Sequence, residues 1–364
     1  MRIKRITRVG LATFLFTAIA LSSAVAKTVP ADNPAFQYVG RIDFTDPKAP
    51  LLSWPGSQVK TTFTGSSVSV ILDDDSGNNY YNIILDGNSD APYVINALQG
   101  KHVYWISSAL ADTSHTIEIY KRTEGEEGAT RFLGLDIPDS ATVKAPPAAP
   151  KRKIEIYGDS ITSGMGNEGI FNGRDDLPSQ KNHYLSYGAI AARELNAQLH
   201  TISQSGIGVL VSWFGFTMSD FYDQLIAVGN NDTQWNFDSW TPDVVVVNLF
   251  QNDRALFLDK QRLNPTPSDK DFINAYADFI KTLRGQYPEA KILCALGSMD
   301  ASAQESKWPE IIRQAVAKQQ QAGDKDIDTL IFPFTGYTQH PRVMHHQQNA
   351  ALLAAKIREM TGWQ

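Results

Sequence analysis

The stretch IEIYGDSITSG, residues 154–164, consists of an apolar run that ends in a Gly-Asp-Ser turn. Downstream of it, short apolar runs alternate with segments of helical length, for example DVVVVNLF (243–250) followed by DFINAYADFIKTLRGQY (271–287). This alternation is typical of parallel strands that are covered by helices on both faces. We therefore predict a three-layer α/β/α domain over residues 153–364, with its functional groups at the carboxyl ends of the strands.

Residues 36–138 have a different pattern, because apolar and polar residues alternate in short runs. Examples are VKTTFTG (59–65), YYNIILDGN (80–88) and HTIEIYKR (115–122), and Asp86-Gly87 is typical of a hairpin turn. The pattern predicts a β-sandwich. Residues 139–152, DSATVKAPPAAPKR, are rich in Pro and Ala, so we expect them to form a linker between two domains.

The charge and the N-terminal residues limit the possible partners and locations. A net charge of −6 in 364 residues argues against nucleic acid as a partner and favours a neutral substrate. Residues 1–26 combine basic residues, a short apolar run and the triplet Ala24-Val25-Ala26, which predicts a cleaved signal peptide. We expect the mature protein to be secreted or periplasmic, without a membrane anchor. An uncleaved anchor is the less favoured alternative, since the apolar run is short for a bilayer.

The single cysteine and the absence of heptads bear on the architecture of the mature chain. Cys294 lies in the apolar run KILCALG, where we expect it to be a small core residue, and one cysteine permits no intramolecular disulfide. No coiled-coil pattern is present, so we expect a monomer.

Ser160 and His340 are the candidate nucleophile and base. Ser160 follows a predicted strand in a Gly-containing turn, a position from which a hydroxyl can project towards backbone N–H groups. His340 follows the last predicted strand and precedes the closing helix, so it belongs to the same edge of the sheet. A serine hydroxyl needs such a base to become a good nucleophile. His345 and His346 remain alternatives for the base.

Two further strand ends supply candidate oxyanion donors. Gly206 in SQSGIG and Asn252 in NLFQND each follow a predicted strand. The backbone N–H groups of Ser160 and Gly206 and the side-chain amide of Asn252 are suited to stabilise the negative charge of a tetrahedral intermediate. Taken singly, Gly206 is also consistent with an ordinary turn, and Asn252 with a solvated loop.

The order Ser, Gly, Asn, His at four strand ends resembles the SGNH hydrolases, also called the GDSL family, from about Ile154 to the C-terminus. With a sandwich ahead of it, the chain resembles carbohydrate esterase family 2, which pairs a small jelly-roll domain with an SGNH hydrolase domain. The stretches GDSITSGMGNE, SQSGIG, VVNLFQND and HPRVMHHQ carry the resemblance. It implies removal of acetyl groups from plant cell-wall polysaccharides or oligosaccharides, without a metal or other cofactor.

The chain departs from this family pattern around the histidine. Many relatives have an acidic residue two or three positions before it, where this chain has Thr338 and Tyr337. We therefore expect a Ser-His dyad, with His340 oriented by a backbone carbonyl or by a distant acid, for which Asp300 is the first candidate.

Three residues are candidates for substrate contacts. Gln339 replaces the aromatic residue that often precedes the histidine, and Phe250 replaces a glycine of the NLGxND block, where it is expected to narrow the acyl pocket. Trp213, together with Phe214 and Phe216, is equally consistent with a sugar platform and with packing between the domains. The acidic run Asp73–Asp75 with Asn78 lacks the spacing of a calcium loop and favours a solvated turn.

Three functions are consistent with these residues. The leading interpretation is a serine acetylesterase that acts on acetylated carbohydrate. The alternatives are a carbohydrate-binding protein with a degenerate hydrolase domain, for which the missing acid before His340 argues, and a GDSL lipase or thioesterase.

Overall fold

The first half of the chain forms two antiparallel sheets that pack face to face. The structure is a computed structural model that describes residues 26–259 and 262–364. One sheet contains β1 (Ala26–Pro30), β3 (Ile42–Asp43), β4 (Leu51–Leu52), β6 (Val68–Asp74), β9 (Gly100–Ser107) and β11 (Thr130–Pro138). The other contains β2 (Gln37–Val39), β5 (Gln58–Thr64), β7 (Asn79–Leu85), β8 (Tyr93–Ala97), β10 (Ser114–Lys121) and β12 (Val143–Lys144). The predicted β-sandwich is confirmed.

The alternating pattern of the sequence corresponds to burial between the two sheets. Phe63 of β5, Val70 of β6 and Phe132 of β11 are fully buried members of one apolar core between the sheets. Two short strands lie outside residues 36–138: β1 pairs with β11, and β12 pairs with β5 inside the expected linker. Because short strands at a sheet edge pair through backbone groups, they need no apolar alternation that a sequence pattern could reveal.

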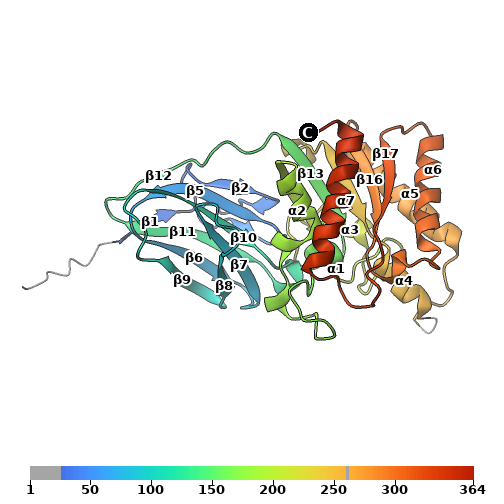
Figure 1. Ribbon diagram of the computed structural model, residues 1–364, viewed down its shortest axis with the longest axis horizontal. Helices are drawn as coiled ribbons and strands as arrows, with labels where there is room; N and C mark the ends of the chain where they lie inside the picture. The colour runs from blue at the N-terminus through green and yellow to red at the C-terminus, as the bar shows by residue number, and fades with distance from the viewer. Residues whose placement is uncertain (1–25, 260–261) are drawn as a thin grey trace, which may run out of the picture.

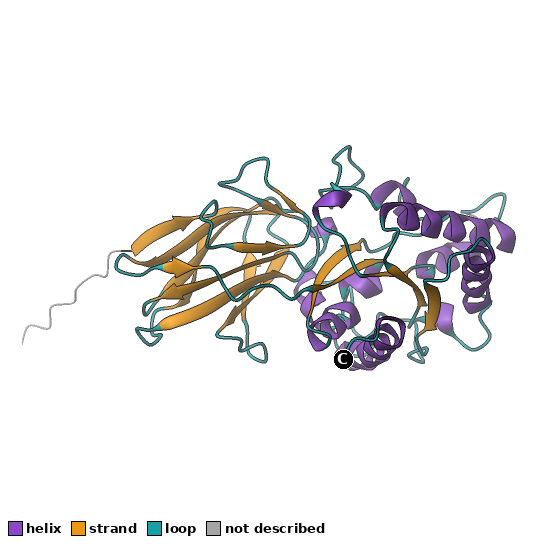
Figure 2. Ribbon diagram, turned by 90° about the horizontal axis from the view of Figure 1, so that it is seen from above, coloured by secondary structure: helices purple, strands orange, loops and turns teal. Residues whose placement is uncertain are grey.

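The second half contains a parallel sheet between two layers of helices, as predicted. The strand order is β14 (Ala197–Ser203), β13 (Arg152–Gly158), β15 (Val244–Asn248), β16 (Lys291–Leu296) and β17 (Ile327–Ile331). The core on one face includes α2 (Tyr187–Glu194) and α7 (Val343–Thr361), and that on the other includes α3 (Met218–Phe221), α5 (Asp269–Gln286) and α6 (Trp308–Gln321). Figure 2 shows this sheet between its helices.

The strands are buried on both faces, as expected for a parallel sheet. All five residues of β15 are buried, and Cys294 lies fully buried in β16, as predicted. No helix within the described part of the chain is long and apolar enough to span a membrane. The predicted signal peptide, residues 1–26, lies outside the described residues except for Ala26, the first residue of β1.

The sandwich and the parallel-sheet domain lie side by side along the long axis of the molecule (Figure 1). Arg41, which follows β2, donates to Glu155 of β13 at 3.1 Å, and both side chains are buried. The Trp54 indole N–H donates to the carbonyl oxygen of Leu225 at 2.8 Å. Polar groups from both domains are therefore paired inside the interface, which ties the sandwich firmly to the parallel-sheet domain.

Candidate active site

Ser160 is presented by a tight turn at the end of β13. The strand ends at Gly158, and Asp159 caps the short helix α1 (Ser160–Ser163) by accepting from the Ile161 N–H at 3.0 Å. A Cβ atom at position 158 would lie 2.0 Å from the Thr162 hydroxyl oxygen, so only glycine fits there. In the Gly-Asp-Ser sequence, Gly158 and Asp159 therefore stabilise the turn, and Ser160 carries the reactive hydroxyl.

The structure brings Ser160 and His340 together. The distance between His340 Nε2 and Ser160 Oγ is 2.8 Å, which is hydrogen-bond distance. His340 lies in the segment between β17 and α7, and both side chains thus lie at the carboxyl edge of the sheet, as the sequence predicts. An imidazole at this distance can take the hydroxyl proton when the oxygen attacks an ester.

The acid that orients His340 is Asp175, which no sequence pattern indicated. Its Oδ2 lies 2.9 Å from His340 Nδ1 and also accepts from the backbone N–H of His340 at 2.9 Å. The hydrogen bond from His340 holds the pKa of Asp175 well below its ordinary value, so the carboxylate is ionised. The three side chains form a Ser-His-Asp arrangement in place of the expected dyad.

Asp300 does not approach the histidine. Its carboxylate accepts from Gln251 at 2.5 Å and pairs with Arg254 at 2.5 Å. Both partners belong to α4 (Gln251–Leu258), so Asp300 joins the end of β16 to that helix. The expectation that Asp300 orients His340 was wrong, because these two partners already bind its oxygens.

The alternative histidines have other partners. His346 is fully buried, its Nδ1 accepts from the backbone N–H of Tyr187 at 3.1 Å, and burial lowers its pKa to about 3. His345 Nδ1 lies 3.1 Å from the Tyr337 hydroxyl and 3.2 Å from the Arg342 backbone nitrogen. His340 is therefore the histidine placed to act on Ser160.

Gly206 and Asn252 lie beyond β14 and β15, close to one another. Asn252 Nδ2 donates to the carbonyl oxygen of Ile207, the residue after Gly206, at 2.9 Å. Gly206 has φ of +87°, which favours glycine. Among residues 26–259 and 262–364, no group accepts a hydrogen bond from the backbone N–H of Ser160 or Gly206. These N–H groups are therefore available to a ligand.

A second carboxylate that we did not predict holds the loop after Gly206. Asp253 is fully buried and accepts from the backbone N–H groups of Val209, Leu210 and Val211 at 2.8–3.1 Å. Burial raises its pKa to about 6. The only sequence signal for Asp253 was its place as the last residue of NLFQND. Asp175 lies in an irregular loop, where no pattern distinguishes it.

The structure distinguishes between the three candidate substrate contacts. Trp213 is 44% exposed, and its Cβ lies 3.5 Å from where a Cβ of Gly206 would be, so it borders the site. The Gln339 amide accepts from the Asn172 N–H at 3.0 Å and donates to the Gly173 carbonyl oxygen at 2.6 Å. Gln339 thus holds the loop that carries Asp175, so its expected substrate contact is corrected to a structural one.

The expectation for Phe250 was also wrong. Its φ of +87° is unusual for a bulky residue, and its side chain is fully buried. The ring packs 4.7 Å from Tyr276 and 5.1 Å from Trp308, measured between centroids, in the core beneath α5 and α6. The positive φ lets the backbone turn as glycine would while the ring fills the core, so Phe250 does not narrow the acyl pocket.

The acidic run of the sandwich has a structural role. Asp74 is buried and accepts from the backbone N–H groups of Ser76 and Gly77 at 3.0 and 2.7 Å and from Asn79 at 2.9 Å. The predicted turn is therefore held by hydrogen bonds to this carboxylate.

Two family models match the chain. The carbohydrate esterase 2 N-terminal model matches residues 38–147, and the model of the GDSL-like lipase/acylhydrolase family matches residues 156–358. The boundary between them falls where the sandwich gives way to the parallel sheet.

Named relatives and solved structures agree with these matches. The cellulase/esterase CelE of Acetivibrio thermocellus is 35% identical over 93% of this chain, which spans only 41% of the length of CelE. An acetylxylan esterase/glucomannan deacetylase of Cellvibrio japonicus is 29% identical over 85% of this chain and 86% of its own. A family two carbohydrate esterase from Clostridium thermocellum, solved with cellohexaose, has 33% identity and a TM-score of 0.81, covering 90% of this chain and 100% of that one.

Proposed function

Because the chain belongs to carbohydrate esterase family 2, we propose that it removes acetyl groups from plant cell-wall polysaccharides or oligosaccharides, with Ser160 as nucleophile and His340 as base. The observation that carries the proposal is the 2.8 Å contact between Ser160 Oγ and His340 Nε2. Relatives named acetylxylan esterase/glucomannan deacetylase support the choice of acetylated xylan and glucomannan.

The reaction proceeds through an acyl-enzyme. Ser160 Oγ attacks the acetyl carbonyl carbon while His340 Nε2 takes its proton, and ionised Asp175 stabilises the resulting imidazolium. The N–H groups of Ser160 and Gly206 and the amide of Asn252 donate to the oxyanion. The imidazolium then protonates the departing sugar oxygen, which leaves acetyl-Ser160.

Hydrolysis of the acyl-enzyme repeats these steps with water. His340 removes a proton from the water as its oxygen attacks the acetyl carbon, and it returns that proton to Ser160 Oγ as acetate leaves. Every proton moves between named atoms, so no other group is required for turnover.

Trp213 is the proposed sugar platform. Phe214 stacks on Phe216 with ring centroids 5.0 Å apart, and Phe216 stacks on the buried Phe221 at 5.7 Å. These rings lead into the core, whereas Trp213 is left half-exposed beside Gly206. An aromatic face at this place suits a sugar ring that carries the acetyl group.

Two choices remain: where the protein acts, and whether it is an esterase or a carbohydrate-binding protein. The signal-peptide pattern supports action outside the cytoplasm, in the periplasm or the medium. A degenerate binding domain was attractive only because no acid precedes His340, and Asp175 supplies one from another loop. The esterase interpretation is therefore favoured over the binding protein.

Release of nitrophenol from nitrophenyl acetate tests the proposal. We expect Ser160→Ala to abolish it, and rates to fall as the acyl chain lengthens. Equal rates for wild type and Ser160→Ala would favour the binding protein, and rates that rise with chain length would favour a lipase or thioesterase. Acetate release from acetylated glucomannan and acetylated xylan then identifies the preferred polymer.

A further inference from the structure

A turn of the sandwich inserts a buried carboxylate into the parallel-sheet domain. Glu124 precedes the short 3₁₀ helix at Gly125–Glu127, which follows β10, and its side chain is fully buried. A Cβ at Gly125 would lie 2.1 Å from the carbonyl oxygen of Ala227, so the turn packs directly against the backbone of the other domain. The position of Glu124 is therefore tightly constrained.

All four hydrogen bonds to the Glu124 carboxylate come from the parallel-sheet domain. One oxygen accepts from the Ser205 N–H at 2.6 Å and the Ser163 hydroxyl at 2.7 Å. The other accepts from the Ser205 hydroxyl at 2.5 Å and Lys181 Nζ at 3.0 Å. A carboxylate with this many donors is fully satisfied despite its burial.

Two of these partners belong to the segments that carry the oxyanion donors. Ser205 directly precedes Gly206, and Ser163 is the last residue of α1, which begins at Ser160. The Ser163 hydroxyl also lies 2.8 Å from that of Ser203, at the end of β14. Glu124 thus joins the turn that presents the Ser160 N–H to the loop that presents the Gly206 N–H.

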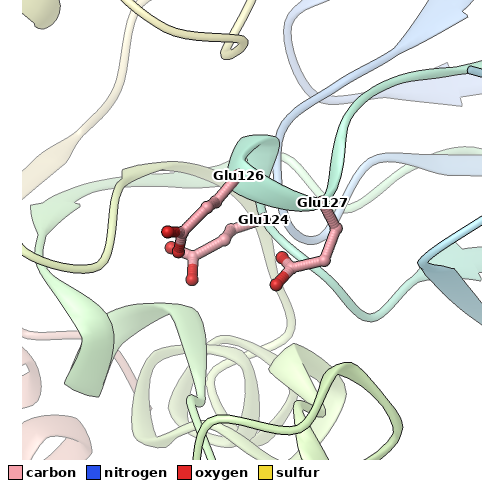
Figure 3. Close-up of side chains that lie close together, drawn as sticks. All are labelled: Glu124, Glu126 and Glu127. Carbon is pink, nitrogen blue, oxygen red and sulfur yellow. The ribbon is translucent and has the colours of Figure 1, made fainter. Parts of the chain in front are cut away.

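Lys181 is the cation that contacts the carboxylates around Glu124. Lys181 Nζ is buried among Glu124, Glu126 and Glu127, whose carboxylates gather on one side of their turn (Figure 3). Burial by itself would raise the pKa of Glu124, yet Lys181 and the two serines hold that pKa below its ordinary value. The ammonium occupies the place that a metal ion would take between the carboxylates, so this cluster is a support and not a metal site.

We propose that Glu124 is a positioning residue for the oxyanion hole, and hence that the sandwich forms part of the catalytic unit. The inference rests on the proposed function, because it assigns Glu124 to the donors of that reaction. Oxyanion donors act only when they are held at the place where charge develops. A displacement of about 1 Å can cost about 100-fold in rate.

Glu124→Gln tests this with nearly unchanged shape. A glutamine offers one acceptor oxygen to donors that now share two, so some of the four hydrogen bonds must be lost. Glu155→Gln is the matched control: Glu155 is also fully buried and also ion-paired across the interface, with Arg41 at 3.1 Å. It lies in the middle of β13 and contacts neither Ser205 nor Ser163.

We expect Glu124→Gln to lower kcat for nitrophenyl acetate by about 100-fold and to change KM little. Its affinity for a methyl trifluoromethyl ketone should fall by a similar factor, because the hemiketal adduct at Ser160 places its oxyanion on the same donors. Glu155→Gln should lower Tm but leave both quantities within about twofold of wild type. If Glu124→Gln is too unstable, Ser163→Ala removes a single hydrogen bond to Glu124, that from the Ser163 hydroxyl, and it should lower kcat in the same direction by a smaller factor.

Wild-type kcat and ketone affinity in Glu124→Gln would overturn the inference, as would an equal loss in Glu155→Gln. Amide hydrogen exchange provides a readout that does not need activity: exchange at Ser205, whose N–H donates to Glu124, should accelerate in Glu124→Gln and not in Glu155→Gln. If wild type and Ser160→Ala hydrolyse the ester equally slowly, the proposed function fails. Exchange unchanged by Glu124→Gln would refute the positioning role in either case.

Discussion

Replacing Asp175 by asparagine measures what the carboxylate charge contributes to His340. Both donors, the imidazole Nδ1 and the backbone N–H of His340, converge on one oxygen, Oδ2, at 2.9 Å. The amide oxygen of asparagine can take that place, which preserves the orientation and tautomer of the ring. Asp175→Asn therefore removes mainly the attraction between the carboxylate and the imidazolium that forms when Ser160 attacks.

The size of this loss follows from the distance and the exposure. Two unit charges about 4 Å apart attract by about 4 kcal/mol at an effective dielectric constant of 20. The Asp175 side chain is 23% exposed, so we take about half of that, ~2 kcal/mol, as the loss after solvent screening. Asp175→Asn should then lower kcat by about 30-fold. Asp175→Ala also removes both hydrogen bonds, and we expect a loss of about 10,000-fold.

The assay is initial-rate kinetics on nitrophenyl acetate at pH 7, with Asp176→Asn as the matched control. Asp176 is the next carboxylate in the chain, but it pairs with Arg174 at 2.8 Å and is exposed. This control should retain wild-type kcat. The reasoning is refuted if Asp175→Asn and Asp175→Ala both stay within about twofold of wild type while Ser160→Ala is inactive.

Three further predictions concern the core, the sugar platform and acid stability. Phe250→Ala should lower the unfolding free energy in urea by about 3–5 kcal/mol and leave acyl specificity unchanged, because the ring fills the core; an altered acyl preference at full stability would contradict this. Trp213→Ala should raise KM for an acetylated oligosaccharide about fivefold and not for nitrophenyl acetate, through the loss of about 1 kcal/mol of stacking; equal effects on both substrates would argue against a platform. The pKa of His346 is lowered to about 3 by burial, so its contribution to stability is present above its unfolded pKa and is lost as pH falls. Between pH 7 and pH 4.5 that loss is about 2.5 kcal/mol. His346→Asn keeps an acceptor for the Tyr187 N–H. Its free energy of unfolding in urea should therefore fall by about 2.5 kcal/mol less than that of wild type over this pH range.

The reacting groups could be predicted from the sequence because the topology gathers them. Ser160, Gly206, Asn252 and His340 each follow a different strand of one parallel sheet, and the carboxyl ends of parallel strands meet at one edge. Periodicity identified the strands and showed that a residue type suited to ester chemistry follows four of them. The resemblance of that order to the SGNH hydrolases then gave the four residues their roles. The three-layer α/β/α arrangement could also be predicted from periodicity, because apolar runs alternate with segments of helical length.

The errors arose where a side-chain direction was inferred without the backbone. Phe250 was placed in the pocket because it occupies a glycine position, but its positive φ turns the ring into the core. Gln339 was placed on the substrate because it occupies an aromatic position, but its amide bonds to the backbone at 172 and 173. Neither direction is encoded in the residue type, since it depends on torsion angles and on loops that are distant in the sequence.

The supporting carboxylates were missed for a different physical reason. Three carboxylates support the site: Asp175 holds the His340 ring, Asp253 holds the loop after Gly206, and Glu124 holds the interface between the domains. Each needs only acceptor oxygens within about 3 Å of a donor. Any segment that passes nearby can deliver such an oxygen, whether from a surface loop, a helix or another domain. Attack on an ester is more demanding, because the nucleophile, base and oxyanion donors must surround a single carbon. The reacting groups therefore follow the strand order, whereas their supports follow whichever segment packs beside them, and only a three-dimensional structure reveals that segment.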